Sequence, residues 1–110
     1  MSRTAIAAAI AAQIALAPLA SLAADCPTTL HLHGYLTVAV AKCGFREAIN
    51  VVSAASDCRA QTGHAAATQF ATDGIRFAQG EMKVKGGVLP WCASVRSQYP
   101  SLISGPMRRR

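Results

Sequence analysis

The stretch CPTTLHLHGYLTVAVAKCG, residues 26–44, decides the fold. Its apolar residues recur every three or four positions, which is the spacing of one face of an α-helix. That face consists of Leu32, Tyr35, Leu36, Ala39, Val40 and Cys43. Thr28 or Thr29 is suited to cap the start of the helix after Pro27, and Gly44 is suited to end it. We therefore expect a helix over residues 29–42.

The same stretch also contains a strand pattern. Residues 30–33 alternate between apolar and polar, and residues 37–40 are rich in β-branched side chains. A hairpin over residues 29–41 that turns at His33 and Gly34 would give an α+β fold instead. We favour the helix because its apolar face is longer and includes Cys43.

Three further helices are expected, over residues 46–59, over residues 64–83, and from Pro90 up to Pro100. Their apolar stripes are Phe45, Ala48, Ile49, Val52 and Ala55; then Ala67, Phe70, Gly74, Phe77, Ala78 and Met82; then Leu89, Cys92, Val95 and Tyr99. Gly74 and Gly80 weaken the third helix, and either of them marks close packing or a bend. The chain is thus expected to form one all-α domain, a small four-helix array over residues 24–100, followed by a disordered basic tail over residues 101–110.

The four cysteines allow three disulfide connectivities, and the lengths of the expected helices decide between them. Cys26 and Cys43 bracket the first helix and would lie about 25 Å apart at 1.5 Å per residue. Cys43 and Cys58 bracket the second helix and would lie about 22 Å apart. Both separations exceed the reach of a disulfide, whose Cα atoms lie within about 7 Å of each other. The remaining connectivity joins Cys26 to Cys58 and Cys43 to Cys92, and an up-down arrangement of the helices also brings these pairs together.

The beginning of the chain has the pattern of a secretory signal peptide. Arg3 precedes an apolar stretch over residues 5–17, Pro18 interrupts it, and small residues follow. We expect cleavage after Ala23, with Ala24 as the second choice, rather than an uncleaved anchor, because the apolar run is shorter than the 20 or so residues of a membrane span. Paired cysteines agree with this interpretation, since disulfides persist in oxidising compartments. The expected location is therefore periplasmic or secreted, with residues 1–23 removed.

The formal net charge of +6 falls to +5 without Arg3, and three of the remaining charges come from residues 108–110. The folded body is then only mildly basic, and nucleic acid is not an expected partner outside the cytoplasm. The basic tail could instead contact an anionic envelope surface.

Histidines provide the one local pattern that suggests a metal site. On a strand, His31 and His33 would share a face and could hold Cu(II), Ni(II) or Zn(II) together with a third ligand such as His64. On a helix, the two side chains point about 200° apart and cannot chelate together. The helical interpretation therefore predicts no metal here.

Patterns of catalytic chemistry are also missing from the sequence. There is no C-x-x-C, no G-x-S-x-G, and no paired carboxylates among Glu47, Asp57, Asp73 and Glu81. We read Asp73 as an exposed residue beside a packing glycine, and Trp91 as a core residue that covers a disulfide. We expect neither a cofactor nor enzymatic activity.

Two functions agree with these features. The preferred hypothesis is a non-enzymatic envelope factor that binds another protein through a rigid helical surface. The alternative is a protein that binds an anionic surface or a small ligand through basic residues such as Lys83 and Lys85.

Overall fold

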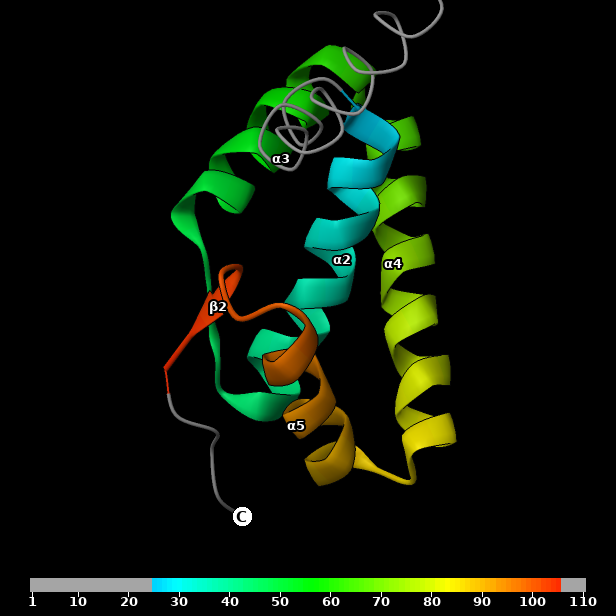
Figure 1. Ribbon diagram of the computed structural model, residues 1–110. Helices are drawn as coiled ribbons and strands as arrows, with labels where there is room; N and C mark the ends of the chain where they lie inside the picture. The colour runs from blue at the N-terminus through cyan, green and yellow to red at the C-terminus, as the bar shows by residue number, and fades with distance from the viewer. Residues whose placement is uncertain (1–24, 106–110) are drawn as a thin grey trace, which may run out of the picture.

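A computed structural model describes residues 25–105 of the chain as a set of helices closed by a small pair of strands (Figure 1). The elements, in order, are α2 (Cys26–Cys43), β1 (Arg46–Glu47), α3 (Ile49–Thr62), α4 (His64–Lys85), α5 (Val88–Gln98) and β2 (Ile103–Ser104). The predicted small all-α fold is confirmed. The hairpin over residues 29–41 is wrong, because that segment is a single helix. The predicted leader, its cut after Ala23 and the arginines at 108–110 lie outside the described residues.

Helix α2 begins earlier than the threonine caps predict, and its cap is Asp25. The two carboxylate oxygens of Asp25 accept hydrogen bonds from the backbone N–H and the hydroxyl of Thr28, at 3.4 Å and 2.6 Å. Pro27 then falls in the first turn, where no N–H is needed. At the other end Gly44 adopts a left-handed conformation with φ 81° and ends the helix as expected.

Helix α2 packs against α4, α3 and α5, and Figure 1 shows it standing between α3 and α4. The backbones of α2 and α4 touch where two glycines face the opposite helix. A Cβ atom on Gly34 would lie 2.0 Å from the carbonyl oxygen of Ala71, and one on Gly74 would lie 1.9 Å from that of His31. The interpretation of Gly74 as a mark of close packing is therefore confirmed. Gly34, which the hairpin alternative placed in a turn, has the same role.

Both predicted disulfides form, and they lie at opposite ends of α2. Cys26 joins Cys58 with a Cα–Cα distance of 5.2 Å, and Cys43 joins Cys92 at 5.7 Å. Each one sits in its own cluster of apolar side chains. The two disulfides indicate an oxidising compartment, such as the periplasm or the extracellular space.

The larger cluster surrounds Cys43 and Cys92, and the smaller one surrounds Cys58. The fully buried side chains of the larger cluster include Leu36, Phe45, Val51, Trp91 and Val95. Trp91 is therefore a core residue, as predicted. Within residues 25–105, no helix combines the length and the apolar character that crossing a membrane requires.

The apolar stripe predicted for the second helix is only partly correct. The helix begins at Ile49, and residues 46 and 47 form β1 instead. It turns Val51, Ala55 and Cys58 toward its neighbours, at spacings of four and three residues. Ile49 and Val52 lie off that face and are 78% and 38% exposed.

The expected disorder from residue 101 onward is wrong for residues 101–105. Strand β2 pairs antiparallel with β1, so that Glu47 lies opposite Ile103. The Ile103 side chain is only 7% exposed and belongs to the larger cluster. The backbone N–H of Ala48 donates to the Leu102 carbonyl at 2.8 Å, and Arg96 donates to the Gly105 carbonyl at 2.5 Å. Burial of one isoleucine together with these long-range bonds orders the segment.

Substituting Gly34 or Gly74 with alanine should strongly destabilise the fold, because the new methyl group would overlap the backbone of the facing helix. We expect each variant to lose about 3 kcal/mol of unfolding free energy or more, the upper range for overpacking. Urea unfolding followed by Trp91 fluorescence measures the change. Gly80→Ala is the matched control on the same helix, since a methyl group added there would meet nothing within 4 Å. It should gain about 0.5–1 kcal/mol. Equal effects at Gly74 and Gly80 would contradict the close contact.

Candidate functional site

Glu81, a half-buried carboxylate on α4, connects three helices. Its Oε1 atom accepts hydrogen bonds from the hydroxyl of Tyr35 on α2 and from the indole N–H of Trp91 on α5, the latter at 3.0 Å. Tyr35 and Trp91 are only 3% and 0% exposed. Buried tyrosine and tryptophan side chains need a partner for their polar atom. One oxygen of Glu81 supplies that partner to both.

Aromatic rings surround Tyr35, one of the two side chains that donate to Glu81. The Tyr35 ring packs against Trp91 and Tyr99 in edge-to-face geometry, with centroid distances of 5.7 Å and 5.6 Å. Phe77 lies 6.0 Å from Tyr35 and 5.7 Å from His31, and it is 54% exposed. The cluster therefore runs from the buried Trp91 to an exposed ring on α4.

Burial is the main reason that the pKa of Tyr35 lies well above the usual value for tyrosine. The hydrogen bond to Glu81 and the negative charge of that carboxylate raise this pKa further. Tyr35 therefore stays protonated and acts as a hydrogen-bond donor. The arrangement links α2, α4 and α5 and is suited to a structural role.

The structure separates the three histidines that the strand alternative grouped into a metal site. His31 packs against Phe77 in edge-to-face geometry, whereas His33 Nδ1 lies 2.7 Å from the Glu47 carboxylate, within hydrogen-bond distance, and so links α2 to β1. His64 is exposed at the start of α4. Among residues 25–105, no three His, Cys, Asp or Glu side chains gather in a way that could hold a metal ion.

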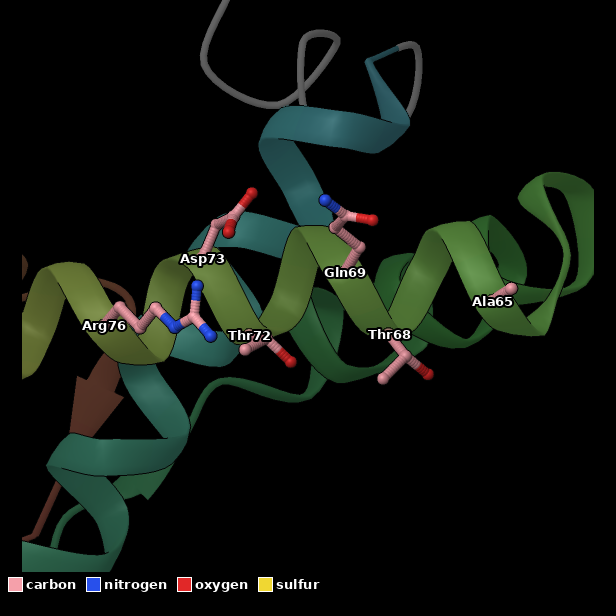
Figure 2. Close-up of a pocket in the computed structure, with 6 residues that line it drawn as sticks. All are labelled: Ala65, Thr68, Gln69, Thr72, Asp73 and Arg76. Atoms are coloured by element: carbon pink, nitrogen blue, oxygen red, sulfur yellow. The ribbon is translucent and has the colours of Figure 1, made fainter.

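A shallow polar depression lies along the outer face of α4 and has a volume of about 320 Å³. Its six lining residues all come from this one helix and are Ala65, Thr68, Gln69, Thr72, Asp73 and Arg76. Figure 2 shows their side chains extending from a single helical surface, without a second wall from another element. Asp73 is exposed and Gly74 beside it is buried, as the sequence predicts.

Large apolar side chains are exposed at two other places. Ile49 and Val52 form what we call the α3 patch. Val84, Val88 and Leu89 lie at the junction of α4 and α5 and are 85%, 37% and 56% exposed. The predicted stripes assigned Ile49, Val52, Phe77 and Leu89 to the interior, so the exposure of all four corrects the sequence analysis.

Glu81 is the site residue that sequence reasoning missed. The search for paired carboxylates passed over it because its partners are Tyr35 and Trp91. A signal was nevertheless present, because Glu81 follows Ala78 and Gly74 by three and seven residues and so shares their apolar face. A carboxylate on a buried face needs donors, and the chain has only one tryptophan and two tyrosines.

Comparison of the chain with protein-family models, with curated proteins and with solved structures gave no match.

Replacing Glu81 should lower stability in proportion to the donors that are left without an acceptor. Glu81→Ala leaves the hydroxyl of Tyr35 and the indole N–H of Trp91 unpaired and should cost about 2–4 kcal/mol of unfolding free energy. Glu81→Gln keeps an acceptor oxygen and should cost about half as much. Urea unfolding measures both. Asp73→Ala, an exposed acid on the same helix, should change stability by less than about 0.5 kcal/mol. A loss for Glu81→Ala no larger than this control would argue against the network.

Stability should decline in alkaline solution because of Tyr35. Its pKa is raised in the folded state, so its contribution is complete below the unfolded pKa of about 10 and is lost as pH rises through the folded value. Above pH 10 or so, the unfolding free energy should fall by up to about 1.4 kcal/mol per pH unit. Thermal melts across this range should show a smaller slope for Tyr35→Phe. Identical slopes for the two proteins would rule out Tyr35 as the cause.

Proposed function

We propose that this chain is an exported protein, released into the periplasm or secreted after removal of residues 1–23, that binds another protein and catalyses no reaction. The two disulfides support an oxidising destination. The charged start, apolar stretch and small residues of the leader support export.

The α3 patch is the observation that carries this proposal. Ile49 and Val52 lie three residues apart on one helix and so share a face. Residues 49–56 contain no charged side chain. Exposed apolar groups on a stretch of helix without charged residues resemble the central part of a protein–protein interface, where charged residues are depleted.

Helix α3 is held firmly at both ends, which favours binding. At its start, the Ala48 N–H bonds to the Leu102 carbonyl, and near its end Cys58 is joined to Cys26. A preorganised surface loses little conformational entropy when a partner binds. The patch can therefore be small and still contribute useful affinity.

Three of the five acidic side chains within residues 25–105 are engaged in contacts within the protein, which supports a non-enzymatic role. Glu81 holds Tyr35 and Trp91, and Glu47 pairs with His33. Asp25 caps α2. These contacts give the three carboxylates structural roles.

Site-specific crosslinking tests the proposal. A photoreactive phenylalanine analogue at Ile49 or at Val52 should crosslink a distinct protein when the chain is expressed and exported, because both positions are exposed and apolar. Mass spectrometry identifies the product. Gln69, exposed on the outer face of α4, is the control position and should give none.

The Ile49→Asp and Val52→Asp double variant should abolish binding of the crosslinked partner once that partner is purified, while the circular dichroism spectrum stays helical. The exported form should also have a mass that corresponds to a start at Ala24 and two disulfides. Equal crosslinking at Ile49 and Gln69, or retention of full-length mass, would refute the corresponding part of the proposal.

A further inference from the structure

Residues 83–90 comprise the end of α4, the two-residue connection and the start of α5. We call this segment the basic turn. Lys83, Val84 and Lys85 end α4, and all three are exposed, Val84 by 85%. Leu89, in the first turn of α5, is 56% exposed. Figure 1 shows this junction at one end of the bundle, on the other side of α2 from α3. Apolar and cationic side chains thus alternate on one exposed tip.

The charge around the basic turn has one sign. Residues 83–90 include Lys83 and Lys85 but no aspartate or glutamate. Glu81 itself lies on the inner side, where Tyr35 and Trp91 donate to it. A surface that approaches the turn therefore meets unopposed positive charge, which favours an anionic partner.

Internal hydrogen bonds pair the backbone of the turn where α4 ends. The N–H of Gly87 donates to the Met82 carbonyl at 3.0 Å, and the N–H of Gly86 donates to the Lys83 carbonyl at 3.1 Å. These are the two bonds of a Schellman motif, which pairs carbonyl groups at a helix end. The backbone N–H of Trp91 donates to the Gly87 carbonyl at 3.2 Å, which is the first backbone hydrogen bond of α5. Each backbone group that is paired within the turn lowers the cost of bringing the turn to an apolar layer.

We propose that the basic turn docks this protein on a membrane surface that contains anionic phospholipids. The side chains of Val84 and Leu89 enter the boundary between headgroups and acyl chains, while Lys83 and Lys85 contact lipid phosphates. This combination of a few apolar residues and adjacent cations is that of peripheral binding. A protein partner fits the tip less well, because the tip exposes none of the aromatic residues that anchor protein interfaces, and Trp91 beside it is buried.

Such docking is reversible and sensitive to salt, because two lysines and two aliphatic side chains give only modest affinity. It is independent of the proposed protein partner, since helix α3, which carries the α3 patch, lies on the other side of α2 from the junction of α4 and α5 (Figure 1). Either contact can therefore fail in an experiment without affecting the other.

Co-sedimentation with vesicles tests the proposal. The probe is oxidised protein without residues 1–23, mixed with vesicles of phosphatidylglycerol and phosphatidylcholine or of phosphatidylcholine alone. Binding should occur only with phosphatidylglycerol and should weaken steeply as NaCl rises from about 0.05 M to about 0.5 M, where the Debye length is about threefold shorter. The Lys83→Gln and Lys85→Gln double variant should bind about 30-fold more weakly, or about fivefold for each lysine. Val84→Ser with Leu89→Ser should lose about tenfold for each side chain.

Matched variants on the other side of α2 provide the controls. Arg46→Gln with Arg59→Gln removes the same charge, and Ile49→Ser with Val52→Ser removes a similar apolar area; both should bind almost as well as the wild type. Circular dichroism confirms the fold of each variant. Three results would overturn the proposal: no binding to anionic vesicles, equal losses in the turn and control variants, or a loss only when Arg108, Arg109 and Arg110 are replaced by serine. A different result would assign the turn to an acidic protein instead of a membrane. In that case the wild type would bind the acidic protein but not the vesicles, and the turn variants would no longer bind the acidic protein.

Discussion

Contact between the backbones of α2 and α4 at Gly34 and Gly74 is the constraint on which the rest of the structure depends. Each glycine faces a carbonyl group of the other helix at a distance that leaves no room for a methyl group. Because Tyr35 follows Gly34 directly and Glu81 lies two turns beyond Gly74, this close approach brings the hydroxyl and the carboxylate together. The same carboxylate then fixes α5 through Trp91. One close contact thus positions three helices.

The disulfides secure the two ends of this arrangement. Many of the apolar residues are alanines, and a small chain buries a smaller share of its surface than a large one, so the core alone provides a narrow stability margin. Closing loops of 32 and 49 residues contributes about 3–4 kcal/mol each in the chain-entropy description. Cys26–Cys58 clamps α3 to the start of α2, and Cys43–Cys92 clamps α5 to its end. With both ends clamped, the exposed surfaces of α3 and of the basic turn are held on a rigid frame.

These two surfaces differ in chemistry and in position. The α3 patch is apolar and has no charge over residues 49–56, whereas the basic turn combines Val84 and Leu89 with two lysines. Helix α2 lies between α3 and α4 (Figure 1). Under our two proposals, a protein docked on a membrane by one end of α4 would leave α3 accessible to a partner. The half-buried carboxylate of Glu81 stabilises the turn from within, because it fixes the end of α4 to Trp91 at the start of α5.

The helices, the all-α class and the disulfide pairing follow from the sequence, because each depends on local periodicity and on the fixed rise of a helix. Tertiary structure alone decided three other features. Ile49 and Val52 look like core residues, but the face that α3 buries is set by its neighbours, and they remain exposed. Ile103 looks like part of a tail, but its pairing with Glu47 spans more than fifty residues and has no local signal. Glu81 shares the apolar face of its helix in the sequence, but only the packing of the helices places Tyr35 and Trp91 beside it, since long-range contacts are not set by spacing along the chain.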